Sequence, residues 1–215
     1  DVLNPQQNFS LEVETLAGLT LDIALFGLNH QAKLSDEAYM IFYNQPQSPC
    51  SSIKLTQNDS QKVSFTINLA SLPQQIERLI LTLTIDGFQT MAHLPLTLIN
   101  LQNQQQTAAS FQLDGSMFNQ EKALMALELY KKDNIWRMSA VGQGFNGGLA
   151  ALIKHFGGEV AEETSINTSP TLSFSKIDLK KKISLEKAAK TGNASIIDLT
   201  KKSLVQLEKK NLLDV

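Results

Sequence analysis

The sequence predicts a mainly β protein whose strands form antiparallel sheets. Through roughly the first 160 residues, short apolar runs that alternate with polar residues recur about every 10 to 20 positions. The links between these runs are short, and none has the length of the crossover helix that parallel strands need. Several runs are rich in the β-branched residues that strands favour, such as residues 79–85 (LILTLTI).

The first half of the chain predicts five strands joined by turns. Clean alternation at residues 9–13 and 19–25 gives the first two, with Gly18 between them. Further strands are predicted at residues 38–43, 53–55 and 63–69. Two prolines make residues 44–50 a loop, because proline cannot donate a hydrogen bond to a sheet. A helical turn is expected to open at Leu72 and Pro73.

The second half continues the series and then changes. Strands are predicted at residues 79–85, 93–101 and 108–113, with the polar residues 102–107 as a hairpin loop. Residues 121–129 fit a helix at first and a strand from Leu127, which pairs in a hairpin with residues 135–141. A glycine turn then leads to a helix from Gly148 to Phe156, and we expect Trp136 to be buried beneath that helix.

A polar segment at residues 159–170 predicts a domain boundary, which divides the chain into a domain at residues 1–160 and an extension at residues 161–215. Residues 171–215 hold ten lysines and five acids, a net charge of +5 that leaves −7 for the rest. This segment has no arginine and one aromatic residue, so a solvated surface is favoured over a nucleic-acid groove. Part of the extension, residues 196–209, fits a helix.

The composition excludes two classes of protein. One cysteine, Cys50, rules out an internal disulfide framework, and no apolar run reaches the roughly 18 residues that a membrane span requires. We therefore expect a cytoplasmic protein. Cys50 has no histidine near it in the sequence, so an inert thiol is favoured over a nucleophile.

Three glycines raise the question of a nucleotide site. Gly142, Gly144 and Gly147 satisfy G-x-G-x-x-G, which in dinucleotide-binding proteins lies inside a βαβ unit. The preceding chain is antiparallel in character, so a tight corner between strand and helix is favoured. An enzyme or nucleotide binder that uses the turn at residues 142–148 remains an alternative.

No other motif predicts catalysis. The three histidines lie far apart without the spacing of zinc ligands, and no G-x-S-x-G is present. Aspartates at strand ends and loops, among them Asp22, Asp59 and Asp86, could supply oxygen ligands to calcium, although solvated turn residues are the simpler interpretation.

Four segments together resemble one known family. In order they are GLTLDIALFGLN, YMIFYNQPQSP, LTIDG and ALELYKKDNIWRMSAVGQGFNGGLAALIKHFGGEV. Over about residues 9–160 they resemble the TerD domain of bacterial tellurium-resistance and stress-response proteins. The resemblance implies a two-sheet antiparallel β-sandwich with a short closing helix. It also implies a protein without established enzymatic activity that acts through protein partners.

The better-known members of that family bind calcium through a dense acidic loop after the FYN strand. The equivalent residues here, 53–63, keep only Asp59, which counts against calcium because a loop site usually needs several carboxylates. Asp22 and Asp86 match other acids of the family, so these three aspartates are the candidate ligands of a weak calcium site. No other cofactor is expected.

The extension also resembles a subgroup of that family. Units of the form I-x-L-x-K recur at residues 177, 183 and 197, as in the linker of TerF-like proteins. This likeness implies that a von Willebrand factor A domain follows residue 215. The leading hypothesis is a non-enzymatic binding or scaffold module of tellurite or general stress resistance, with calcium-dependent regulation as the first alternative.

Overall fold

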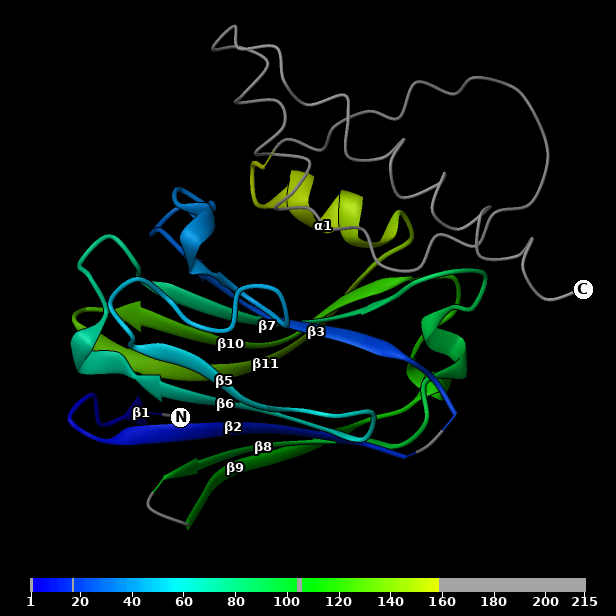
Figure 1. Ribbon diagram of the computed structural model, residues 1–215, viewed down its shortest axis with the longest axis horizontal. Helices are drawn as coiled ribbons and strands as arrows, with labels where there is room; N and C mark the ends of the chain where they lie inside the picture. The colour runs from blue at the N-terminus through cyan, green and yellow to red at the C-terminus, as the bar shows by residue number, and fades with distance from the viewer. Residues whose placement is uncertain (1, 17, 104–105, 159–215) are drawn as a thin grey trace, which may run out of the picture. The chain divides into compact units, whose positions relative to one another are not determined.

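The computed structural model describes residues 2–16, 18–103 and 106–158. Within them, two antiparallel sheets pack face to face and one helix lies over the outer face of the larger sheet (Figure 1). The predicted fold class is thereby confirmed. The predicted domain boundary and the extension, with its helix at residues 196–209, lie outside the described residues.

The larger sheet has six strands in the order β1-β11-β10-β7-β3-β4. Their bounds are Val2–Leu3 (β1), Ile135–Phe145 (β11), Ala123–Lys132 (β10), Arg78–Ile85 (β7), Leu21–Leu28 (β3) and Met40–Ile41 (β4). Its central strands are buried on both faces. This explains why β7 is almost continuously apolar or β-branched in sequence.

The smaller sheet has five strands in the order β5-β6-β2-β8-β9. Their bounds are Ile53–Asn58 (β5), Lys62–Asn68 (β6), Asn8–Thr15 (β2), Thr97–Asn103 (β8) and Gln106–Leu113 (β9). Four 3₁₀ turns complete the described part, at Glu37–Tyr39 (η1), Leu69–Ser71 (η2), Met91–His93 (η3) and Gly115–Met117 (η4). In β2 every second residue is buried, and the apolar residues of β6 alternate in the same way, although Ser64 on its outer face is also buried. The alternation seen in the sequence therefore identifies the core face of each strand.

Two apolar cores lie on opposite faces of the six-stranded sheet. The main core fills the space between the sheets and includes the fully buried Leu11, Phe65 and Leu81. The second lies between the six-stranded sheet and helix α1 (Gly148–His155), where Leu152 and Phe156 pack over residues such as Phe26 and Met125. The described residues up to 158 are therefore layered as helix, sheet and sheet.

Three predicted elements differ from the structure. Residues 123–126 belong to the strand β10, so the helix predicted at the start of 121–129 is wrong: these residues are buried on both faces of a central strand, and a fully buried strand lacks the alternation that reveals it. Of the strand predicted at residues 38–43, the first two residues lie in η1 and the next two form β4, while Phe42 makes only an isolated bridge to Gln45. His93 lies in η3, and β8 begins four residues later.

The position of Trp136 corrects a further expectation. Its side chain is 4% exposed, so its burial is confirmed, but it belongs to the core between the sheets. It lies near the start of β11, whereas helix α1 follows the other end of that strand, on the opposite face of the sheet. Trp136 is thus not beneath the helix.

Candidate functional site

Two glycines of the motif, Gly142 and Gly144, lie in an antiparallel hairpin, and the third, Gly147, is the N-cap of α1 at the predicted corner between strand and helix. Strand β11 runs on through Gly142 and Gly144 and pairs antiparallel with β10 throughout. Gly142 has φ of +67°, and with Val141 it forms a β-bulge opposite Ala126. A Cβ on Gly144 would lie 2.2 Å from Cγ of Glu121. The motif therefore shapes a strand edge and lacks the βαβ setting of a dinucleotide site.

The carboxylate of Asp59 is occupied by its own turn. It accepts hydrogen bonds from Gln57 Nε2 at 2.7 Å, from the backbone N–H of Gln61 at 3.1 Å and from that of Lys62 at 2.7 Å. These hydrogen bonds lower the pKa of Asp59. The residue closes the β5–β6 hairpin, as aspartate commonly does in turns.

The three candidate calcium ligands lie at one end of the sandwich but do not form one site. Asp22 alternates with the core residues Leu21 and Ile23, so it lies on the outer face of the six-stranded sheet, while Asp59 is in a turn of the other sheet. Asp86 follows β7, and its side chain accepts the backbone N–H of Gly87. Among the described residues, no three His, Cys, Asp or Glu side chains gather as metal ligands. The residues present do not fit a calcium site of several carboxylates.

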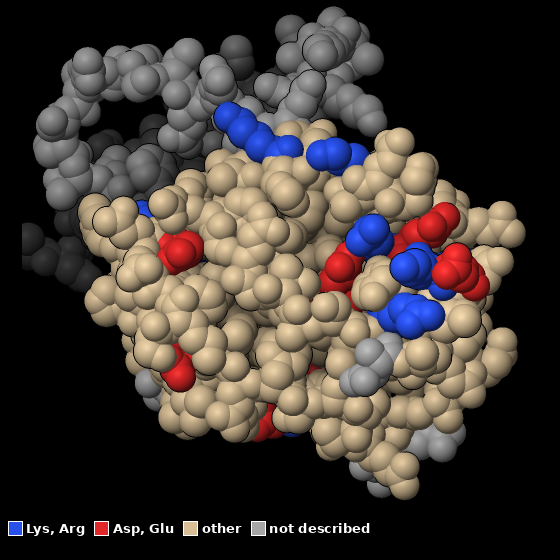
Figure 2. All heavy atoms as spheres, turned by 180° about the vertical axis from the view of Figure 1, so that it is seen from behind, with Lys and Arg blue, Asp and Glu red and all other residues tan. Residues whose placement is uncertain are grey.

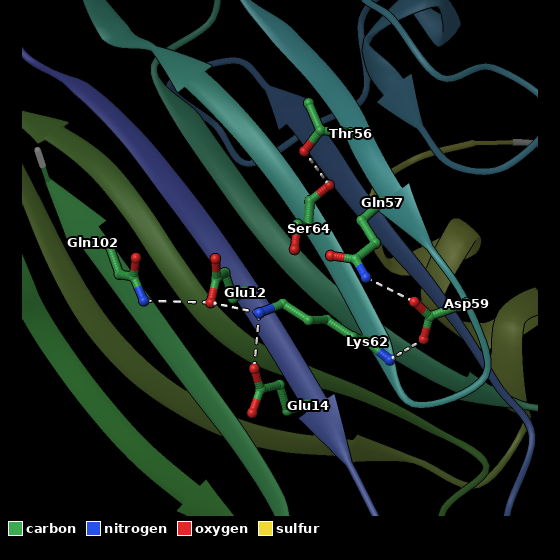
Figure 3. Close-up of polar contacts among 8 residues, drawn as sticks. All are labelled: Glu12, Glu14, Thr56, Gln57, Asp59, Lys62, Ser64 and Gln102. Carbon is green, nitrogen blue, oxygen red and sulfur yellow. Dashed lines mark hydrogen bonds and ion pairs between the residues drawn. The ribbon is translucent and has the colours of Figure 1, made fainter. Parts of the chain in front are cut away.

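A charged array lies on the outer face of the five-stranded sheet (Figure 3). Lys62 Nζ is 3.1 Å from Glu12 Oε2 and 2.9 Å from Glu14 Oε1, which places one lysine between two carboxylates of the neighbouring strand β2. The hydrogen bonds to Glu14 and Glu12 raise the pKa of Lys62. With two carboxylates and one ammonium group, this Glu–Lys array (Glu12, Glu14 and Lys62) keeps an excess of negative charge.

Polar neighbours extend the array across the sheet. Gln102, on β8, donates a hydrogen bond from its Nε2 to Glu12 Oε2 at 3.3 Å (Figure 3). On the other side of β2 and β6, Thr56 of β5 donates from its Oγ1 to the carbonyl of Ser64 at 3.1 Å. The hydroxyl of Ser64 is buried without a hydrogen-bond partner. The face is therefore polar across four strands, and the charges that are most exposed lie where β2 ends.

A groove lies at that end of the sheet, beside the array. Its volume is about 270 Å³, and it is open to solvent. The end groove is lined by Glu14, Thr15, Leu16, Gln61, Lys62, Leu96 and Leu98. Leu16 is 60% exposed and Leu96 is 40% exposed, and the backbone N–H of Leu16 bonds the carbonyl of Leu96 at 3.2 Å. The end groove thus places two exposed leucines beside carboxylates that a single lysine does not balance.

Cys50 lies among hydroxyl groups that the sequence prediction of an inert thiol did not consider. Its Sγ is 2.8 Å from Ser52 Oγ, 3.7 Å from Ser48 Oγ, and 3.4 Å from Tyr39 Oη, which donates to it. Partial burial acts to raise the pKa of Cys50, but the hydrogen bonds from Ser52, Tyr39 and Ser48 outweigh it and lower the pKa to about 7. Burial, and then the contact with Cys50, raises the pKa of Tyr39 to about 12.

We expect the alkylation rate of Cys50 by iodoacetamide to reach half its maximum near pH 7, because the thiolate is the nucleophile. Mass spectrometry over a pH series measures it directly, since the chain has one cysteine. Ser52→Ala should move the midpoint upward. Ser51→Ala is the matched control, because Ser51 bonds Gln47 instead. A wild-type midpoint near pH 9 would contradict the expectation.

Within the described residues, no helix has the length and apolar character to cross a membrane. The fold and the surface together define a β-sandwich protein with a helix over one sheet and a charged array on the other. The family model of the TerD domain matches residues 7–156, and the chain therefore belongs to the TerD domain family.

Relatives of this chain are named for resistance to tellurium or to chemical damage. The chain is 33% identical over 167 residues to the tellurium resistance protein TerA of Alcaligenes sp., a match that covers 73% of this chain and 49% of the relative. It is 32% identical over 130 residues to chemical-damaging agent resistance protein B of Clostridium acetobutylicum, covering 54% of this chain and 92% of that protein. The chain thus spans about half the length of the Alcaligenes relative.

A solved structure has the same fold. The crystal structure of a TerD homologue from Streptomyces coelicolor A3(2) superposes with a TM-score of 0.56 at 15% identity, covering 69% of this chain and 95% of that one. At this identity the likeness shows the fold alone.

Proposed function

We propose that this chain is a non-enzymatic binding module of bacterial tellurite or general stress resistance, which acts in the cytoplasm through protein partners. The end groove is the observation that carries the proposal. Its exposed leucines would lose water-accessible surface on binding an apolar side chain, and the surplus carboxylate of the Glu–Lys array would attract a basic one. The partner that fits is a protein segment in which a basic residue adjoins an apolar one.

The resistance context comes from the relatives. Tellurium resistance and chemical-damage resistance are the roles in the names of the proteins that this chain resembles. The narrower prediction of a TerF-like protein, with a von Willebrand factor A domain after residue 215, stays a prediction. Sequencing of the complete gene tests it, because that domain carries a recognisable D-x-S-x-S motif.

A growth assay tests the end groove. In a bacterium that depends on this protein for tellurite resistance, we expect Leu16→Asp/Leu96→Asp to lose resistance, because the charges oppose burial of an apolar side chain. Phe88→Asp is the matched control, since Phe88 is a fully exposed apolar residue outside the groove. Full resistance of the groove variant at equal protein level would refute the assignment.

Calorimetric titration distinguishes the alternatives. Because Asp22, Asp59 and Asp86 do not converge, we expect calcium to give no saturable heat at millimolar concentration. Saturable binding that is weakened by Asp59→Ala or Asp86→Ala would instead establish the calcium-regulated alternative. Tight nucleotide binding that Gly144→Val abolishes would favour the enzyme or nucleotide binder, and the scaffold proposal would fail.

A further inference from the structure

Both sheets end in an open strand edge on the same flank of the sandwich. In the five-stranded sheet the last strand is β9, and in the six-stranded sheet β1 covers only Trp136 and Arg137 of β11. Residues 139–145 of β11 therefore have no strand on their outer side within the described residues. We call the two open edges, residues 106–113 and 139–145, the β9/β11 flank.

The opposite flank is closed. There the six-stranded sheet ends in β4, which has two residues. The outer edge of β5 is bonded by the preceding loop, since Leu55 N donates to the Pro46 carbonyl at 2.7 Å and Ser48 N donates to the Ile53 carbonyl at 3.0 Å. Short edge strands and covering loops are the usual protection against association between sheets.

The β9/β11 flank lacks the charges and prolines that usually protect such an edge. Neither residues 106–113 (QTAASFQL) nor residues 139–145 (SAVGQGF) contain Asp, Glu, Lys, Arg or Pro. Ser110, Gln112, Ser139 and Ala140 are exposed. Figure 2 shows the molecule from this side, where the charged side chains gather at one end and along the margins and leave a broad stretch without charge.

One bulge interrupts each edge. Ala108 is the extra residue in β9, and Val141 with Gly142 forms the bulge in β11. Regular backbone remains at residues 109–113, where Ala109 and Phe111 pack partly against the main core. This stretch offers an ordered row of backbone donors and acceptors to another strand.

We propose that the β9/β11 flank is a self-association surface, on which a second copy of this chain docks about a two-fold axis perpendicular to the sheets. In that arrangement β9 pairs antiparallel with β9 of the copy, and the open part of β11 faces its own copy at the same time. The five-stranded sheet continues across the dimer into a second five-stranded sheet.

Two features of the flank favour a copy over a single peptide strand. The edges belong to sheets that pack about 10 Å apart, so one extended peptide could pair with only one of them. A copy presents both edges at the matching separation. Since both edges are uncharged, the symmetric arrangement brings no like charges together.

Sedimentation velocity of the full 215-residue chain tests the proposal. The chain mass is 23.7 kDa, and we expect a species of twice that mass at micromolar concentration. The double variant Ser110→Lys/Gln112→Lys brings lysines of the two copies close together across the β9 pair. Because like charges repel, the dissociation constant of the variant dimer should rise roughly tenfold or more. Ser139→Lys should weaken the dimer through the other edge.

The matched control adds the same charge elsewhere on the same sheet. Asn8 and Thr66 are exposed and lie on adjacent inner strands, β2 and β6, so Asn8→Lys/Thr66→Lys should stay dimeric. Far-UV circular dichroism checks that each variant is folded. If the β9 variant unfolds, Ser139→Lys still tests the dimer through the β11 edge. A monomeric wild type, or a dimer that neither edge affects, overturns the proposal. A dimer that only the β9 change affects overturns the two-edge arrangement.

Discussion

Replacing Phe156 with alanine is expected to lower the free energy of unfolding by about 3–5 kcal/mol, the usual cost of removing a buried phenylalanine. Phe156 is 1% exposed and follows helix α1. Its ring lies 5.1 Å from that of Phe26, in the core between the helix and the six-stranded sheet. The cavity would lie between two rigid elements, so little collapse can offset the loss.

Urea denaturation of the wild type and the variant measures this effect. Phe88→Ala is the matched control, since it removes the same atoms from a fully exposed side chain and should leave stability within about 0.5 kcal/mol. A Phe156→Ala loss as small as that of the control would show that the helix does not pack on the sheet as described.

Ending the chain at residue 146 is expected to prevent folding, whereas ending it at residue 160 should preserve a cooperative melt close to that of the full chain. The shorter chain lacks α1 and exposes the outer face of the six-stranded sheet, including Phe26 and Met125. Burial of Leu152, Ile153 and Phe156 stabilises the fold by about 5–9 kcal/mol, which is comparable to the whole stability of a typical domain.

Two hydrogen bonds that hold helix α1 in place are kept in the chain ending at residue 160 and lost in the chain ending at residue 146. Gly158 N donates to the Ile153 carbonyl at 2.9 Å, and Leu34 N donates to the Phe156 carbonyl at 2.8 Å. Differential scanning calorimetry compares the two shortened chains with the full chain. Folding of the 146-residue chain would contradict the account of the second core, and failure of the 160-residue chain would contradict the predicted domain boundary.

The sequence predicted strands best where one face of a strand is buried and the other is solvated. In β2 and β6 this produces strict alternation, which Phe9, Leu11 and Phe65 display. It failed in β10, where residues 123–126 are buried on both faces and the run ALMA fits a helix as well as a strand. The predicted position of Trp136 beneath the helix was wrong for a related reason. Alternation indicates that Trp136 is buried but does not indicate on which face of the sheet.

The candidate site was much less predictable. Glu12 lies on the strand predicted at residues 9–13 and Glu14 directly after it, so their spacing indicates a common face, but Lys62 joins them only through the register of β2 and β6. Leu16 and Leu96 come from different loops and carry no signal in the sequence. For Cys50, the serines at positions 48 and 52 were visible, whereas Tyr39 reaches it only in the fold.

By itself, the sequence determined the mainly β class, most of the strands, and membership of the TerD family, because these depend on local periodicity and on motifs contiguous in the chain. Tertiary structure decided which strands meet and which edges stay open. It placed Gly142 and Gly144 in the open, bulged edge of β11, ahead of the predicted corner, which forms at Gly147 and Gly148, and it assembled the end groove from separate loops. Pairing between strands far apart in sequence depends on the energy of the whole packed assembly, which no local pattern contains.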